Sequence, residues 1–322
     1  MIWPKGKKCA LAFIDDTDDA VYPDIESIYK ILISNGIRTT KTIWVYPVRD
    51  VGVSYGDDIS TNENYYNFIK YLQSEGCEIA LHNVGSGSYL REEIISGLDL
   101  YKSKIGSYPR IHVNHSYNPD NIYCGEKRYS EPFSSLLKIM FKEYTGFSGD
   151  EAGSPHFWGD LHKKHIKYSR SFETDVFNLL NVVEFPFIDD QFSEFCNYFY
   201  PSVFCSNQDL FAKQISERNL DNLIKERGCS IIYTHFGYFS QRGNIEDKVL
   251  NSIRYISERS SDIWVAPVGD VLDYMMSQKS PGKISMLSRW KLEALNIISR
   301  VSNRYIYKLD DSHYKKKINR AK

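Results

Sequence analysis

Four apolar runs of this sequence end in side chains that can bind a metal ion or transfer a proton. The first run is followed by an acidic stretch that begins with Asp15 and Asp16, and the others are followed by His82, His115 and His235. Carboxylates and imidazoles on neighbouring strands are typical ligands of open metal sites. Singly, such acids cap helices and such histidines are structural residues. Together, they predict a metal site.

The elements around these residues alternate between strands and helices. Apolar and β-branched runs predict strands at 9–14, 39–46, 77–82, 110–115, 229–234 and 262–267. Helical spacing of apolar residues predicts helices at 24–35, 62–75, 89–105, 132–141, 209–227, 245–259 and 268–276. A short strand is predicted at 146–148, and no element is predicted with any regularity in 149–208.

This alternation predicts a parallel sheet with helical crossovers. An open doubly wound sheet is the alternative, but no glycine-rich phosphate loop follows the first strand. At least six strand–helix units favour a barrel instead. In a parallel barrel, functional groups collect at the carboxyl ends of the strands, where the acids and histidines lie.

With these motifs the sequence resembles the polysaccharide deacetylase family, the NodB-homology group. The family's first motif is a strand ending in an aspartate pair, and residues 9–16 (CALAFIDD) match it with one extra residue. Its second motif has two histidines four residues apart; His82 matches the first, and Ser86 stands where the second is expected. Its last motif, a strand ending in Leu-His, is similar to 231–235 (IIYTH), and 263–271 is also typical of the group. The resemblance covers residues 8–276.

The resemblance implies a distorted (β/α) barrel of about seven strands that binds a divalent metal, often zinc. By position, Asp15 would be the catalytic base, Asp16 and His82 metal ligands, and His235 the proton donor to the departing amine. Ser86 is a poor zinc ligand, so we expect His115 to supply the missing imidazole. Oxygen from Asn83 or Asn114, or a water molecule, is the alternative. The arginine-containing third motif of the family is not clear in this sequence.

Further residues are predicted to bind substrate: Asn114, Trp158, Asp160 and Arg170. A tryptophan can stack on a sugar ring, and an arginine can hold Asp15 or an anionic substituent. The alternatives are that Trp158 anchors the core and that Arg170 forms a surface ion pair. A second acid pair after an apolar run, at 189–190, either binds substrate or opens a loop.

Composition excludes several classes of protein. The 322 residues include 40 Lys and Arg and 41 Asp and Glu, so the formal net charge of −1 gives no overall field for nucleic acid. The six cysteines form no C-x-x-C pair, which favours a reducing compartment over a disulfide scaffold. Because the N-terminus lacks the pattern of a signal peptide and no run can span a bilayer, we expect a cytoplasmic protein.

The segment 281–322 differs from the barrel at 1–280 and is predicted as a separate basic helical tail. It contains eleven Lys or Arg and three acids, a net charge of +8 (11 − 3). Residues 284–301 have the spacing of an amphipathic helix with an apolar face that includes Met286, Trp290, Leu292, Leu295 and Ile298. Two interpretations remain open: peripheral contact with an anionic membrane, or packing on the barrel followed by a frayed basic end.

The resulting expectation is a cytoplasmic, metal-dependent hydrolase that removes an acetyl or other acyl group from an amino sugar. A nucleotide-linked or lipid-linked intermediate of surface-polysaccharide synthesis is the expected substrate. One alternative is a glycoside hydrolase on the same barrel, with Asp15 and another acid as its pair. The other is a glycan-binding protein that has lost its metal, an interpretation that Ser86 favours.

Overall fold

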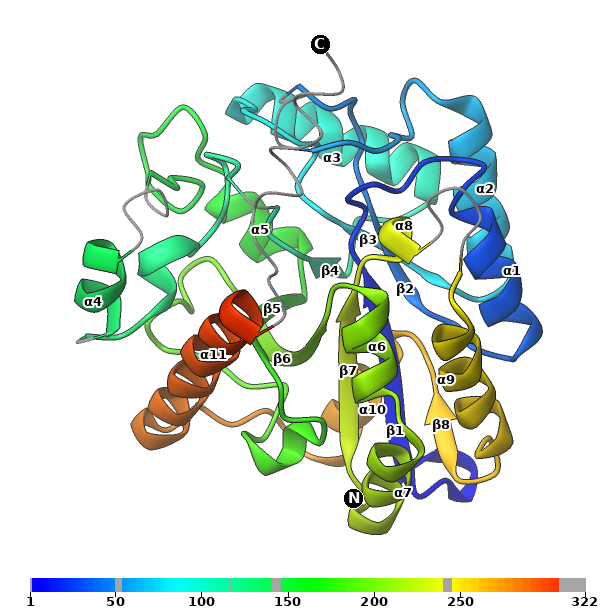
Figure 1. The fold of residues 1–322 in the computed structure, drawn as a ribbon. Helices are drawn as coiled ribbons and strands as arrows, with labels where there is room; N and C mark the ends of the chain where they lie inside the picture. The colour runs from blue at the N-terminus through cyan, green and yellow to red at the C-terminus, as the bar shows by residue number, and fades with distance from the viewer. Residues whose placement is uncertain are drawn as a thin grey trace.

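Seven parallel strands close into a barrel, shown in a computed structural model that describes residues 2–49, 54–115, 117–131, 133–140, 146–239 and 245–306 (Figure 1). The strands follow one another around the barrel in chain order, and β1 closes it by pairing with both β7 and β2. The seven are β1 (Cys9–Asp15), β2 (Thr40–Ile43), β3 (Glu78–Leu81), β4 (Ile111–His112), β5 (Tyr168–Thr174), β6 (Tyr198–Cys205) and β7 (Cys229–Thr234). An eighth strand, β8 (Ile263–Val265), pairs with the first half of β1. The predicted barrel is confirmed.

Helices surround the barrel and connect successive strands (Figure 1). The α-helices are α1 (Glu26–Ser34), α2 (Glu63–Ser74), α3 (Arg91–Ile105), α4 (Phe133–Met140), α5 (Gly159–His165), α6 (Gln208–Gln214), α7 (Glu217–Glu226), α8 (Phe236–Phe239), α9 (Asp247–Glu258), α10 (Val268–Gln278) and α11 (Met286–Ile306). Short 3-10 helices are η1 (Pro4–Gly6), η2 (Gly125–Arg128) and η3 (Leu179–Asn181). None of the helices in the described ranges is long and apolar enough to cross a membrane.

Most predicted elements are confirmed, and three differ. The helix predicted at 209–227 is two helices, because Ser216 begins a new one by accepting a hydrogen bond from the Asn219 backbone N–H. No strand forms at 146–148, and the strand predicted at 110–115 has only two residues, Ile111 and His112. Residues 132 and 141, the predicted ends of one helix, lie outside the described residues, whereas α4 lies between them.

The barrel core explains why the strands have continuous apolar sequences. All seven residues of β1 are buried, because its side chains face either the barrel interior or the surrounding helices. Two elements in the segment without predicted structure complete the barrel: β5 and β6. All six cysteines are free, buried thiols, so they pack in the protein as small hydrophobic residues.

Candidate metal centre

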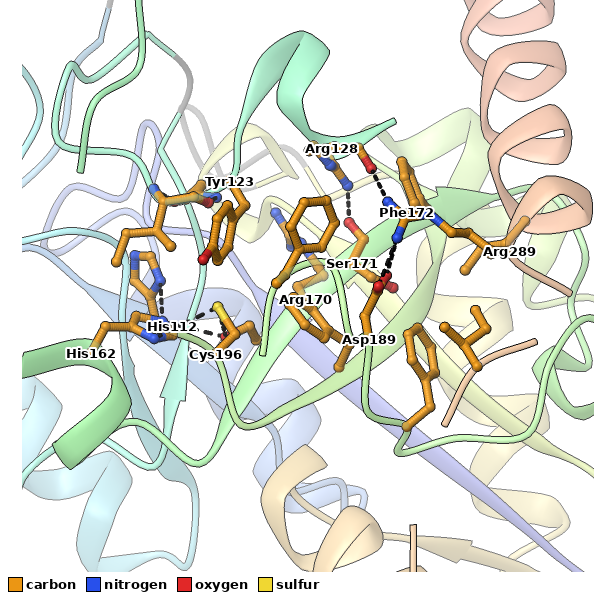
Figure 2. Close-up of a pocket in the computed structure, with 18 residues that line it drawn as sticks. His112, Tyr123, Arg128, His162, Arg170, Ser171, Phe172, Asp189, Cys196 and Arg289 are labelled. Carbon is orange, nitrogen blue, oxygen red and sulfur yellow. Dashed lines mark hydrogen bonds and ion pairs between the residues drawn. The ribbon is translucent and has the colours of Figure 1, made fainter. Parts of the chain in front are cut away.

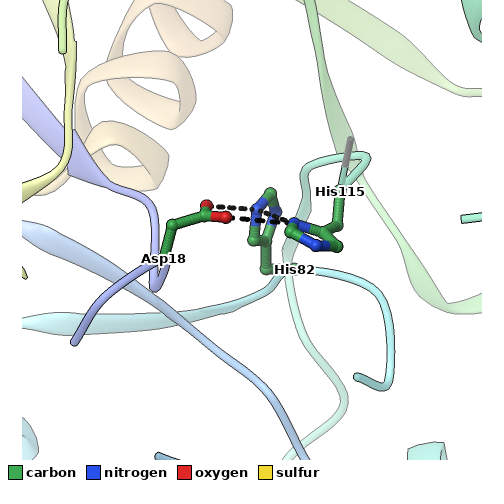
Figure 3. Close-up of side chains that lie close together, drawn as sticks. All are labelled: Asp18, His82 and His115. Carbon is green, nitrogen blue, oxygen red and sulfur yellow. Dashed lines mark hydrogen bonds and ion pairs between the residues drawn. The ribbon is translucent and has the colours of Figure 1, made fainter. Parts of the chain in front are cut away.

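Three side chains from separate loops meet at the carboxyl end of the barrel: Asp18, His82 and His115 (Figure 3). Asp18 follows β1, His82 directly follows β3, and His115 lies three residues beyond β4. The Nε2 atom of His82 lies 3.2 Å from Asp18 Oδ2 and 3.1 Å from His115 Nδ1. His115 Nδ1 lies 3.5 Å from Asp18 Oδ1. One ligand atom from each residue therefore lies within 4.8 Å of the other two.

The hydrogen bonds of His82 orient its free nitrogen toward this centre. Its Nδ1 lies 3.1 Å from the carbonyl oxygen of Val113, to which it can only donate. In the neutral ring, Nε2 then has a lone pair that faces Asp18 and His115. A carbonyl that fixes the opposite nitrogen in this way is typical of histidines that bind metal.

His115 is held from its other side by two serines. Its Nε2 lies 3.0 Å from both Ser54 Oγ and Ser86 Oγ. When these hydroxyls accept from Nε2–H, the lone pair of Nδ1 faces the centre. Burial lowers the pKa of His115 to about 4, with the positive charges of His82 and His235 acting in the same direction and Asp18 and Asp16 opposing them. The ring is therefore neutral near pH 7, as a ligand must be.

Asp18 is a buried carboxylate in which one oxygen, Oδ2, has a hydrogen-bond partner. It is 4% exposed, and its Oδ1 has no hydrogen-bond partner within the described part of the chain. Burial raises the pKa of Asp18, but His115, His235 and His82 outweigh burial and keep that pKa well below its usual value. A buried charged oxygen without a donor is costly unless a cation is nearby. This donor set therefore fits a divalent metal.

Asp16 and Arg170 form a second feature beside these residues. The guanidinium of Arg170, on β5, donates to both carboxylate oxygens of Asp16 at 3.0 and 2.7 Å. Arg170 also lies 3.9 Å from the centre of the Tyr233 ring. Asp16 Oδ2 lies 3.9 Å from His82 Nε2, so the carboxylate is held beside the metal-binding cluster. Arg170 thus holds Asp16, not Asp15.

His235 approaches the same oxygen of Asp18 as His82 does. Its Nε2 is 3.4 Å from Asp18 Oδ2 and 3.2 Å from the Tyr233 hydroxyl, while its buried Nδ1 has no hydrogen-bond partner among the residues that the structure describes. Burial alone would lower the pKa of His235, but the hydrogen bond to Asp18 and the negative charges around it raise that pKa. Asp16, Asp18 and His235 also have ligand atoms within 4.8 Å of one another.

Asp15, the predicted base, has contacts that do not suit that role. It is fully buried and forms an ion pair of 2.8 Å with Lys41, which is also fully buried. It accepts further hydrogen bonds from the Tyr29 hydroxyl at 2.8 Å and from the Phe236 backbone N–H at 2.7 Å. These three contacts favour a structural role for Asp15 over the predicted role of base.

The predicted substrate-binding residues are distributed differently from expectation. Trp158 is 1% exposed and donates through Nε1 to the Asp120 carbonyl at 2.7 Å, so it anchors the core and does not stack on a ligand. Asp160 forms a two-pronged ion pair with Arg91. These contacts favour structural roles for Trp158 and Asp160 over the predicted substrate binding. Asn114 holds a loop by bonding the backbone N–H and carbonyl of Ile122.

A groove opens beside Ser86 and His115. Its volume is about 390 Å³, and it is lined by Arg49, Ser86, Gly87, Ser88, His115, Tyr117, Asn118 and Pro119. Pockets for small molecules typically measure about 300–1,000 Å³, so the groove could hold one sugar residue. Tyr117 is 45% exposed at its edge.

A second cavity lies beside Arg170, between β5 and residues of α11 (Figure 2). Its volume is only about 30 Å³, enough for about one water molecule. It is bordered by His112 and His162 at one end and by the Asp189–Arg289 ion pair at the other. This cavity is too small for a sugar.

Comparison with known proteins agrees with this geometry at the level of the fold. No protein-family model and no curated protein matches the sequence. A crystal structure described as a "probable Polysaccharide deacetylase from Pseudomonas aeruginosa PAO1" matches with a TM-score of 0.52 and 10% identity, over 87% of this chain and 94% of that chain. The Puue allantoinase matches with a TM-score of 0.50 and 12% identity, over 87% and 93%. This chain shares the polysaccharide deacetylase fold.

Sequence reasoning identified His82, His115 and His235 but missed other contributors. Asp18 belongs to the same acidic stretch as Asp16. Only the path of the folded loop shows that Asp18 is the carboxylate nearer to the histidines. Ser54 had no signal in the sequence, because it contacts His115 from a distant loop. Ser86 was noted only as a replaced histidine, whereas its hydroxyl contacts His115, one of the three residues of the cluster.

Proposed function

We propose that this protein is a metal-dependent hydrolase that removes an acyl group from an amino sugar. The observation behind the proposal is the convergence of Asp18, His82 and His115 with an unpaired carboxylate oxygen at their centre. The shared fold with a deacetylase structure supports the reaction class. The deacetylase and the allantoinase both act on amide-type C–N bonds, so this bond class suits the barrel.

The proposed ligand set differs from the sequence-based one. Asp18, His82 and His115 would hold the metal, with Asp16 close by as the base. A bound divalent metal, zinc being the first candidate, would supply Lewis-acid polarisation of the amide carbonyl and make water more acidic.

The remaining roles follow from the contacts of the side chains. Asp16, oriented by two hydrogen bonds from Arg170, would accept the proton of the attacking water. His235, whose pKa is raised, would be protonated more readily and donate to the departing amine from Nε2. A buried carboxylate held by arginine and a separate imidazole acid, with ligand atoms within 4.8 Å of one another and of Asp18, would make a base and an acid at one centre.

The expected substrate is a nucleotide-linked or lipid-linked amino sugar made inside the cell. Support for a reducing compartment such as the cytoplasm comes from the six free, buried thiols. The groove beside His115 has room for about one sugar residue, which suits a small precursor.

Acetate release from N-acetylglucosamine oligomers and from nucleotide-linked N-acetylglucosamine tests the proposal. Protein loaded with zinc, cobalt or nickel should release acetate, and Asp16→Asn should slow release by about 10²–10⁴-fold, the usual contribution of a general base. Asp160→Asn is the matched control, because Asp160 pairs with Arg91 outside the cluster. Shortened sugar chains without free acetate, or ring opening of a cyclic ureide with no acetate released from either amino sugar, would refute the amino-sugar assignment.

A further inference from the structure

The C-terminal helix α11 packs on the barrel through a polar face. The buried residues of this face are Arg289, Leu292, Glu293, Asn296, Ser299 and Asn303. Arg289 forms an ion pair with Asp189 at 2.6 Å, and Glu293 accepts from the Ser130 backbone N–H at 2.9 Å. Specific hydrogen bonds and ion pairs, with Leu292 as the one fully apolar buried contact, fix this helix to the rest of the chain.

The opposite face of α11 is apolar and exposed. Met286, Leu287, Trp290, Ile298 and Val301 are 63%, 74%, 37%, 61% and 38% exposed. They recur at helical spacing on one side of the helix, which lies on the outside of the barrel beside β5 and β6 (Figure 1). A surface helix normally turns its apolar stripe to the core and its polar face to water. Although Leu292, Leu295 and Ile297 of this helix pack against the core, its five exposed apolar residues leave an apolar face in contact with water.

The net charge of the sequence from Arg300 onward indicates which kind of partner can bind this exposed face. From Arg300 to the end of the sequence there are eight Lys or Arg (300, 304, 308, 315, 316, 317, 320 and 322) and two acids, a net charge of +6 (8 − 2). A second copy of the chain would bring the same positive charge to the interface, and like charges repel. An anionic surface would attract it. Apolar residues on one face with nearby Lys and Arg are typical of helices that lie in a membrane interface.

We propose that α11 binds the surface of an anionic lipid bilayer, with its exposed face inserted between lipids. Trp290 is 37% exposed and would lie at the interface, where tryptophan is favoured. The basic residues after Val301 would bind lipid phosphates, each adding to the attraction of the helix. Because the helix is fixed to the barrel by its polar face, the whole molecule would be held at the membrane. This proposal does not depend on the catalytic roles assigned above.

Co-sedimentation with lipid vesicles tests the proposal on the full chain. Vesicles of phosphatidylcholine and phosphatidylglycerol in equal amounts should bind the protein, and vesicles of phosphatidylcholine alone should bind it much less. Ile298→Asp should weaken binding about tenfold or more, because it places a charge where apolar area would be buried. Added salt should weaken it as well, since it screens the basic residues.

Leu250→Asp is the matched control, since Leu250 is an exposed leucine on α9, 37% exposed, and its variant should bind like the natural chain. Melting temperatures of both variants establish that each is folded. A folded protein that does not co-sediment with anionic vesicles would overturn the proposal. Equal binding to both kinds of vesicle, or a dimer in solution that Ile298→Asp dissociates without any lipid binding, would overturn it too and point to a different occupant of this face.

Discussion

At the scale of single residues, the most informative position is Ser86. The family motif has a histidine there, yet in this chain the hydroxyl lies 3.0 Å from Nε2 of His115. His115 comes from a different loop, and Ser86 contacts its Nε2, the ring nitrogen that faces away from Asp18 and His82. A replaced ligand is thus accompanied by a new histidine and by a group that orients it, which argues against the metal-free alternative.

Ser86→Ala tests this orienting role. The variant removes one of the two hydroxyls at Nε2 of His115 and leaves Ser54 in place. Loss of an outer partner of a metal ligand typically weakens metal binding by about 10–100-fold, and we expect the lower end because one serine remains. Zinc affinity measured by competition with a chelator checks it. Ser88→Ala, at an exposed position two residues along, should match the natural chain; equal affinities for the two variants would contradict the role.

The three histidines could be predicted because each follows an apolar run that had to be a strand. The choice among the acids could not. Asp16 still has the backbone hydrogen bond of β1 to Thr234 at 2.9 Å, while Asp18 lies two residues further, in the loop. Which carboxylate faces the histidines depends on the path of that loop, and no pattern of residue types encodes it.

At the scale of elements, the sequences of β5 and β6 explain why these two of the seven barrel strands were not predicted. β5 has the sequence YSRSFET, in which Arg170 reaches Asp16 and Glu173 lies within 3.7 Å of Arg170 and of Arg128. β6 contains a proline at position 201. Polar residues that serve the site and the ion-pair network break the apolar run on which strand prediction depends. The helices, with intact spacing, were predicted well.

The attachment of α11 depends on a buried ion pair between Arg289 and Asp189. Asp189 belongs to the second acid pair of the sequence, at 189–190. Asp189 and Arg289 are both 7% exposed, whereas the neighbouring pair of Asp190 and Lys283 is on the surface. Asp189→Ala leaves a buried guanidinium without this partner and should lower the free energy of unfolding by about 3–5 kcal/mol. Asp190→Ala should change it by less than about 1 kcal/mol. Urea unfolding of both variants measures the difference, and equal losses would mean that Asp189 does not hold the helix.

At the scale of the whole molecule, barrel closure is what brings the site together. Asp18 and His235 are separated by most of the chain, yet pairing of β1 with β7 puts their loops side by side. The same closure brings His82 and His115 to the other side of Asp18. A parallel barrel therefore lets four loops place side chains around one point. The location of the site could be predicted from the sequence more reliably than the role of each residue in it.

The central claim is that Asp18, His82 and His115 hold one divalent metal while Asp16 does not. Zinc binding by equilibrium dialysis, compared among the natural chain, Asp18→Asn and Asp16→Asn, tests it most directly. We predict a single zinc ion in the natural chain, at least about 100-fold weaker binding in Asp18→Asn, a loss beyond that of an outer partner, and retained binding in Asp16→Asn. Absence of zinc from the natural chain, or loss in Asp16→Asn with retention in Asp18→Asn, would contradict the account.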